Sequence, residues 1–116
     1  MMERKYDLDK RLIKFAVEVT KIIECLPEGK VCNHLGGQLL RSGTSPALNY
    51  AEAQAAESRK DFIHKLRIIL KELRETAVCM EILTERNLLP ESKMHSENRE
   101  LIAIFTKSIV TAKNAV

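Results

Sequence analysis

The chain has 116 residues, of which 45% are hydrophobic and 30% charged. These proportions predict one globular domain over residues 1–116 and exclude a disordered chain. Aromatic residues make up only 4% and tryptophan is absent, so aliphatic side chains must build the core, which suits helices packed on helices. The net charge of +3 is far below that of a dedicated nucleic-acid-binding protein, and it permits such a partner without requiring one.

The cysteines and the N-terminal sequence indicate the compartment. Cys25, Cys32 and Cys79 form no C-x-x-C pair, and their odd number argues against a disulfide framework. We expect the three thiols to be buried as small hydrophobic groups. The chain begins without the apolar segment of a signal peptide, and no apolar run approaches the ~20 residues that span a membrane. A cytoplasmic protein without a membrane partner is therefore expected.

The first helix is predicted over residues 8–26, with Asp7 or Asp9 as its N-cap. Its apolar side chains recur at helical spacing on one face. They are Leu8, Leu12, Phe15, Val19, Ile22, Ile23 and Leu26. Pro27 ends this helix, because proline lacks a backbone donor and Gly29 follows as a flexible joint.

The second helix is predicted over residues 31–56, and two opposite sides of it are apolar or small. One side carries Leu35, Leu39, Ser42, Pro46 and Ala53, and the other carries Leu40, Thr44, Ala47, Leu48, Ala51 and Ala55. A chain this short cannot cover both sides, so we expect the second set to form an oligomer interface. Ser45 and Pro46 also suit the start of a helix, so the helix could kink or restart there.

The third and fourth helices are predicted over residues 58–86 and 91–113. A capping box from Ser58 to Asp61 begins the third. The apolar positions are Phe62, Leu66, Ile69, Leu70, Leu73, Ala77, Met80 and Leu83 in the third helix, and Leu101, Phe105, Ile109 and Ala112 in the fourth. No segment alternates with the period of a strand. Because short connections reverse the chain direction, we expect an all-α, antiparallel up-down-up-down four-helix bundle.

Catalytic and metal-binding motifs are absent from the sequence. There is no H-E-x-x-H, C-x-x-C or Glu-x-x-His pattern, and His34, His64 and His95 fall on separate predicted helices. The hydroxyls of Ser42, Thr44 and Ser45 lie beside Arg41 and could form an anion-binding turn. The alternative is that they bond to carbonyls one turn back, as hydroxyls inside helices do. We expect no metal and no cofactor.

Asn49, Glu52 and Gln54 are polar residues in an otherwise alanine-rich stretch. A ligand in a polar pocket lined by Thr44, Asn49 and Glu52 would favour an enzyme. Glu52 as a general base has no second carboxylate or histidine at a fixed spacing to support it. It could instead pair with Arg41 or Lys60. We therefore predict that the protein is not an enzyme and has no catalytic residue.

A row of basic side chains follows one side of the third predicted helix. Lys60, His64, Arg67, Lys71 and Arg74 recur at i, i+4, i+7, i+11 and i+14. The row extends about 20 Å and could follow a line of phosphates. The alternative is an ordinary solvated face whose charge is relieved by the neighbouring acids, Asp61, Glu75 and Glu81.

Three motifs together carry a family resemblance: Q-L-L-R-S-G-T-S at residues 38–45, N-Y-A-E-A at 49–53 and S-R-K-D-F-I at 58–63. They resemble the four-helix-bundle family named after intervening sequences in 23S ribosomal RNA, with Pro46 as a departure from the family pattern. The resemblance implies antiparallel bundles that assemble as closed rings, notably homopentamers. The family is encoded within ribosomal RNA insertions of some bacteria, and a distant relative is a basic pentamer that accompanies a reverse transcriptase.

The resemblance supplies no catalytic residues. We expect a homo-oligomeric ring, a pentamer on the strength of the resemblance, that binds structured RNA or other nucleic acid, DNA included, through its basic surface. The predicted contacts are Lys60, Arg67, Lys71 and Arg74, followed by Arg41 and Arg59. The alternative is a structural or protein-adaptor ring with no nucleic-acid partner, which the modest net charge favours.

Overall fold

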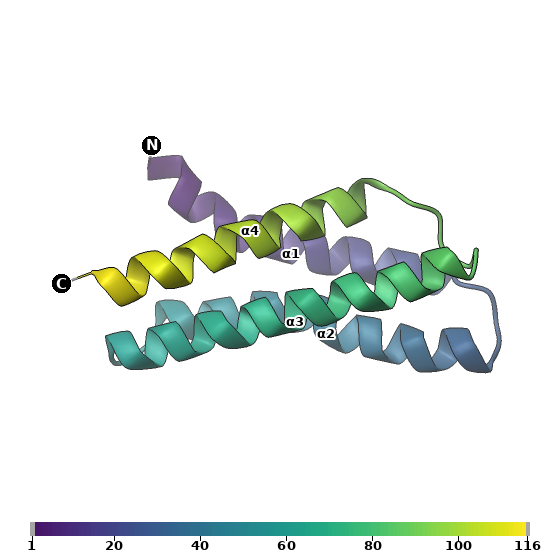
Figure 1. Ribbon diagram of the computed structural model, residues 1–116, viewed down its shortest axis with the longest axis horizontal. Helices are drawn as coiled ribbons and strands as arrows, with labels where there is room; N and C mark the ends of the chain where they lie inside the picture. Colours follow the sequence, from purple (N-terminus) through teal and green to yellow (C-terminus); the bar gives the residue numbers. More distant parts are fainter. Residues whose placement is uncertain (1, 116) are drawn as a thin grey trace.

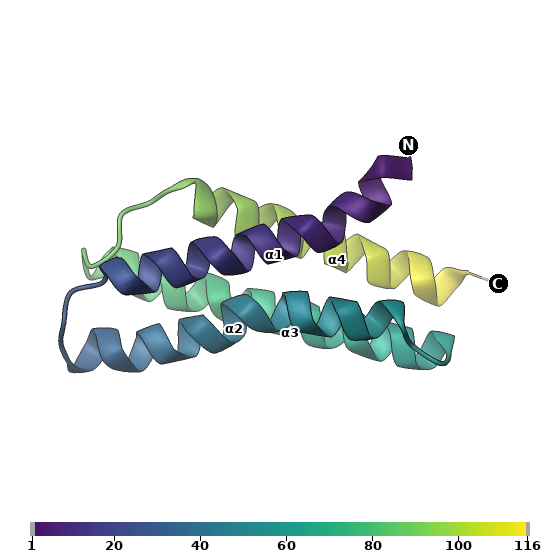
Figure 2. The ribbon, with the colours of Figure 1, turned by 180° about the vertical axis from the view of Figure 1, so that it is seen from behind.

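Four helices form the protein in the computed structural model, which describes the backbone of residues 2–115 and the side chains of residues 8–115. They are α1 (Met2–Cys25), α2 (Lys30–Gln54), α3 (Arg59–Glu85) and α4 (Lys93–Asn114), and this described part contains no strand. Figure 1 shows α1 and α4 in one layer and α2 and α3 in the other, with both chain ends at the same end of the molecule. The view from behind in Figure 2 shows the same arrangement. The all-α, up-down-up-down architecture is therefore as predicted.

The start of α1 differs from the prediction. The helix begins at Met2, so Asp9 lies inside it and does not cap it; its carboxylate accepts a bond from the backbone N–H of Lys10 at 2.8 Å. The side chain of Asp7 lies outside the described residues. Residues 2–7 contain neither glycine nor proline, so nothing in their sequence stops the helix from extending toward the N-terminus.

Helix α2 runs through Pro46 without a break, so the restart suggested by the sequence does not occur. Pro46 is buried together with Leu39 and Ala53 on the core side. The proline costs the helix a backbone hydrogen bond, but the core packing on both sides of it holds the two halves in one helix. By contrast, α3 begins at the predicted N-cap: the Ser58 hydroxyl accepts a bond from Asp61 N–H at 3.0 Å, which is one of the two bonds of the predicted capping box.

The predicted inward faces make up the core. The largest fully buried apolar side chains come from all four helices: Leu12, Phe15 and Val19; Leu39; Leu66, Ile69, Leu73, Met80 and Leu83; and Leu101 and Phe105. The partly buried members of the predicted stripes, including Leu8, Leu26 and Phe62, pack against them. Helical periodicity therefore identified the core side of each helix correctly.

The seam between α1 and α4 is held partly by charge. Arg11 of α1 donates to Glu97 at 2.9 Å and to Glu100 at 2.7 Å, both on α4. The hydrogen bond to Glu97 and the further contact with Glu100 raise the pKa of Arg11 above its usual range. Within the described residues, none of the helices combines the length and apolar character needed to cross a bilayer.

Candidate nucleic-acid interface

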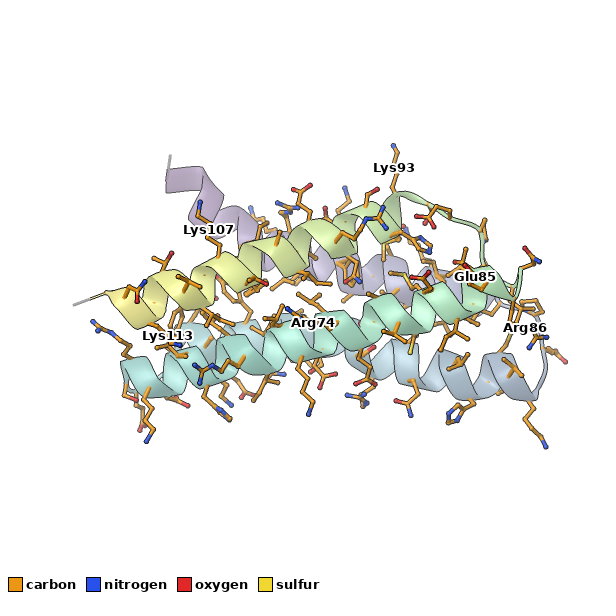
Figure 3. The ribbon with its side chains drawn as sticks, viewed as in Figure 1. Arg74, Glu85, Arg86, Lys93, Lys107 and Lys113 are labelled. Atoms are coloured by element: carbon orange, nitrogen blue, oxygen red, sulfur yellow. The ribbon has the colours of Figure 1, made fainter. Side chains whose placement is uncertain are left out.

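The predicted basic row lies on the outer side of α3. We call Lys60, Arg67, Lys71 and Arg74 the basic stripe. All four side chains are exposed, and none forms an ion pair with another described side chain. Figure 3 labels Arg74 partway along α3. The core side of α3, with Leu66 and Leu73, fixes this orientation, because the basic positions fall opposite it.

The acids near the stripe do not neutralise it. Glu75, which the sequence suggested as a relieving charge, turns to Arg41 on α2. Neither Asp61 nor Glu81 forms an ion pair with any described basic group. Four uncompensated cations therefore follow one edge of the bundle, as an extended anionic partner requires.

Arg41 lies in a different environment from the stripe. Its guanidinium forms an ion pair with Glu72 at 2.8 Å and a second one with Glu75. The hydrogen bond to Glu75, and then the one to Glu72, raise the pKa of Arg41. Glu72 is buried, so Arg41 balances a carboxylate that has little access to water. Arg41 thus joins α2 to α3, and its charge is already compensated.

Arg59 and a residue that sequence reasoning missed form a second basic group at the end of the bundle. The Arg59 guanidinium donates to the backbone oxygen of Ala115, just beyond α4. Lys113, in the last turn of α4, lines the same hollow of about 420 Å³ as Arg59, Lys60 and Arg67. The predicted topology could have identified Lys113, because the start of α3 and the end of α4 must meet in an antiparallel bundle.

The predicted interface side of α2 is uncovered in the single chain. Leu48 is 67% exposed and Leu40 44% exposed. Ala51 and Ala55 are also exposed, whereas Thr44 and Ala47 are half-buried. None of these six residues is charged, and nothing in the described protomer buries the two leucines.

Helix α1 also carries exposed apolar side chains. Val19 of α1 meets Gly43 of α2, and the two helices run antiparallel. Ile13 and Val17 therefore lie level with the part of α2 that carries Leu48. Ile13 is 55% exposed and Val17 45% exposed, so α1 also has exposed apolar side chains at this level of the bundle.

The polar side chains considered for catalysis form hydrogen bonds or an ion pair with other residues of the bundle. The hydroxyl of Thr44 donates to the Leu40 carbonyl one turn back at 2.7 Å, and the Asn49 amide donates to the Ser45 carbonyl at 3.1 Å. Glu52 pairs with Lys65 at 2.6 Å.

The pairing of Glu52 with Arg41 or Lys60 is therefore wrong, because the register between α2 and α3 places Lys65 opposite Glu52. The hydrogen bond to Glu52 raises the pKa of Lys65. This ion pair gives Glu52 a structural role at the seam between the two helices.

The cysteines differ from one another. Cys32 and Cys79 are buried, as expected, but Cys25 is exposed because it ends α1 on the side away from the core. Burial raises the pKa of the Cys79 thiol, and the nearby charge of Glu75 adds to this effect. Among the described residues, no group of three or more His, Cys, Asp or Glu side chains could hold a metal ion.

Comparisons with known proteins agree with this architecture. The sequence profile of the family described as 23S rRNA-intervening sequence protein matches residues 4–108. A crystal structure of a protein with unknown function from the S23 ribosomal protein family of Bacteroides thetaiotaomicron is similar, with a TM-score of 0.77 and 29% sequence identity over 87% of this chain and 96% of that chain. No curated protein matches the chain. Neither the family description nor the solved relative names an enzymatic activity.

Proposed function

The chain belongs to the 23S rRNA-intervening sequence protein family, and from this premise we propose that it is a non-enzymatic homo-oligomeric protein that binds structured RNA through the basic stripe. The observation that carries the proposal is the exposure of Lys60, Arg67, Lys71 and Arg74 without an ion-pair partner among the described side chains. Arg41 contributes less, because Glu72 and Glu75 already compensate its charge.

The stripe would recognise the RNA backbone and not its bases. Its cations extend along α3 for about 20 Å, so they can meet successive phosphates on one side of a folded RNA. The stripe contains no aromatic side chain on which a base could stack. Binding should therefore follow RNA shape and charge, and it should weaken steeply as salt is added.

Assembly of several subunits would raise the RNA affinity above that of a single basic stripe. We propose that the uncovered side of α2, with Leu40, Leu48 and Ala51 at its centre, packs against another copy in a closed ring, a homopentamer if the family resemblance extends to stoichiometry. A ring repeats the stripe once in every subunit. Several stripes on one RNA raise the apparent affinity without any new type of contact.

The test is fluorescence anisotropy of a labelled structured RNA across a range of salt concentrations. We compare the wild type with a triple variant, Lys60→Glu, Arg67→Glu and Lys71→Glu. The matched control carries Lys14→Glu, Lys93→Glu and Lys107→Glu, which change the net charge equally at exposed positions on α1 and α4. The proposal predicts that the stripe variant loses binding and the control retains most of it. Equal loss in both variants, or binding that does not respond to salt, would contradict the proposal.

The second candidate is a structural or protein-adaptor ring without a nucleic-acid partner. The net charge of only +3 favours it. Recovery of a specific protein partner from a nuclease-treated lysate, together with no salt-dependent RNA binding by the purified protein, would support this role over the first.

A further inference from the structure

We propose that the hollow between the start of α3 and the end of α4 binds a phosphomonoester, the terminal phosphate of an RNA strand. This inference rests on the proposed RNA binding and adds a distinct site to it. The hollow, which we call the end pocket, has a volume of about 420 Å³ and is lined by Arg59, Lys60, Ile63, His64, Arg67 and Lys113.

Two helices bring the cations of the end pocket together. Lys60, His64 and Arg67 lie on successive turns of α3, and Lys113 comes from the last turn of α4. Figure 3 shows Lys113 at the end of α4 that lies beside the start of α3. Among the residues whose side chains are described, no carboxylate lines the pocket. A group that enters it therefore meets positive charge from two directions.

The charges in the end pocket are available to a ligand. Lys60, Arg67 and Lys113 form no ion pair with another described side chain. Arg59 uses part of its guanidinium to hold the Ala115 carbonyl, which orients the side chain at the rim. Because a guanidinium has five N–H groups, this contact leaves others to donate.

The start of α3 adds to the positive potential. The Ser58 side chain accepts from Asp61 N–H, and the Ser58 carbonyl accepts from Phe62 N–H. The N–H groups of Arg59 and Lys60 precede these and have no partner inside the helix. The 27-residue helix therefore presents the positive end of its dipole beside the cationic side chains.

A terminal phosphate fits this arrangement better than an internal one. A phosphomonoester carries a charge of about −1.5 to −2 near neutral pH and three acceptor oxygens, whereas an internal phosphodiester carries one charge. The rest of the stripe, Lys71 and Arg74, offers cations from one helix only. Lys60 and Arg67 belong to both the stripe and the pocket, so a strand that follows the stripe reaches the pocket where the protein surface ends.

The test compares three versions of one RNA: with a 5′ phosphate, with a 3′ phosphate and with hydroxyls at both ends. Wild-type protein should bind one phosphorylated version about tenfold more tightly than the hydroxyl version, which corresponds to about 1.4 kcal/mol. Lys113→Gln should abolish this preference, because it removes the cation that α4 contributes to the pocket, while the basic stripe on α3 still binds the hydroxyl version. The matched control is Lys107→Gln, an exposed lysine of α4 that does not line the pocket. Equal affinity of wild-type protein for all three RNAs would overturn the end-pocket assignment while leaving the stripe intact.

A second measurement tests phosphate binding in the end pocket without RNA. It is needed if no version of the RNA binds, a result that would contradict the proposed function itself. Inorganic phosphate is titrated at constant ionic strength while the imidazole NMR signals of His64 are followed. A saturable shift that Lys113→Gln removes would support a phosphate site in the pocket. An absent or linear response would overturn it. If phosphate saturates the pocket but phosphorylated RNA gains no affinity, the site takes free phosphate and its assignment to an RNA end is wrong.

Discussion

Val19 of α1 packs directly on the backbone of Gly43 in α2. A β-carbon built on Gly43 would lie 2.8 Å from Cγ2 of Val19, a separation that side chains do not tolerate. Val19 is fully buried and β-branched, so its χ1 is restricted, and its other methyl carbon, Cγ1, would also be close, at 2.9 Å. Gly43 is therefore the residue that allows α1 and α2 to approach this closely and that fixes their register.

In Gly43→Ala the added methyl group overpacks the contact with Val19, which should cost about 1–3 kcal/mol. A gain of about 1 kcal/mol in helix propensity offsets part of this cost, so the fold should lose up to about 2 kcal/mol of stability. Urea unfolding followed by circular dichroism measures the difference.

Gly37→Ala is the matched control, since a β-carbon at Gly37 meets nothing within 4 Å. It should stabilise α2 by about 0.5–1 kcal/mol. In a Val19→Ala background, Gly43→Ala should cost less than in the wild type. If Gly43→Ala and Gly37→Ala have the same effect, the close contact does not govern packing of the two helices.

The sequence predicted most properties of the separate helices, apart from the start of α1 and the exposure of Cys25, and it missed the pairings that depend on register between helices. Periodicity placed Leu39 and Leu73 in the core, and the Ser58 cap was evident from local spacing. The pairing of Glu52 with Lys65 was missed, because residues on different helices come opposite one another only after contacts such as Val19 with Gly43 set the offset.

The residues of the candidate site also differ in how well the sequence predicted them. The stripe lies on one helix, so spacing alone found Lys60, Arg67, Lys71 and Arg74. The end pocket combines two helices, and Lys113 did not stand out in the sequence as an isolated lysine near the C-terminus. Sequence order also did not reveal that Arg41 is already paired, since both of its partners lie on α3.

Removing Arg41 and removing Lys71 should have different effects on RNA binding. Lys71→Gln should lower the RNA affinity and reduce the salt slope, in magnitude, by about 1 for each stripe that the RNA contacts, as expected for the loss of one phosphate contact per stripe. Arg41→Gln should leave the slope nearly unchanged, because Glu72 and Glu75 already compensate its charge. It should instead lower the urea midpoint, since buried Glu72 loses its partner. A full unit lost from the slope in Arg41→Gln would show that Arg41 reaches phosphate.

The three cysteines should react with iodoacetamide at very different rates at neutral pH. Cys25 is exposed and should react first, whereas buried Cys32 and Cys79 should react only after unfolding. Burial raises the pKa of the Cys79 thiol, so less of the reactive thiolate is present at a given pH. Mass spectrometry after short pulses counts the modified sites, and urea should expose the remaining two. A Cys25→Ser protein should show almost no rapid labelling. Modification of Cys79 as fast as Cys25 would mean that α3 opens readily.

The uncovered side of α2 leads to the last prediction, which concerns assembly. Ala51 lies between Leu48 and Ala55 on a side of the helix whose predicted interface residues carry no charge. A carboxylate placed at this position and buried against another copy would lose its hydration without gaining a partner. In a free protomer it would remain in water and cost little, since glutamate is a good helix former.

Ala51→Glu should therefore dissociate the proposed oligomer while the circular dichroism spectrum keeps most of its helical signal. Light scattering during size-exclusion chromatography measures the mass, which should fall toward the 13.2 kDa of one chain. Ala103→Glu introduces the same side chain at an exposed position of α4 and should leave the assembled mass unchanged. If Ala51→Glu keeps the full mass, subunits meet through another surface. If the wild type itself has the mass of a single chain, the two leucines and the neighbouring α1 side chains are exposed in solution, and repetition of the basic stripe around a ring cannot account for RNA affinity.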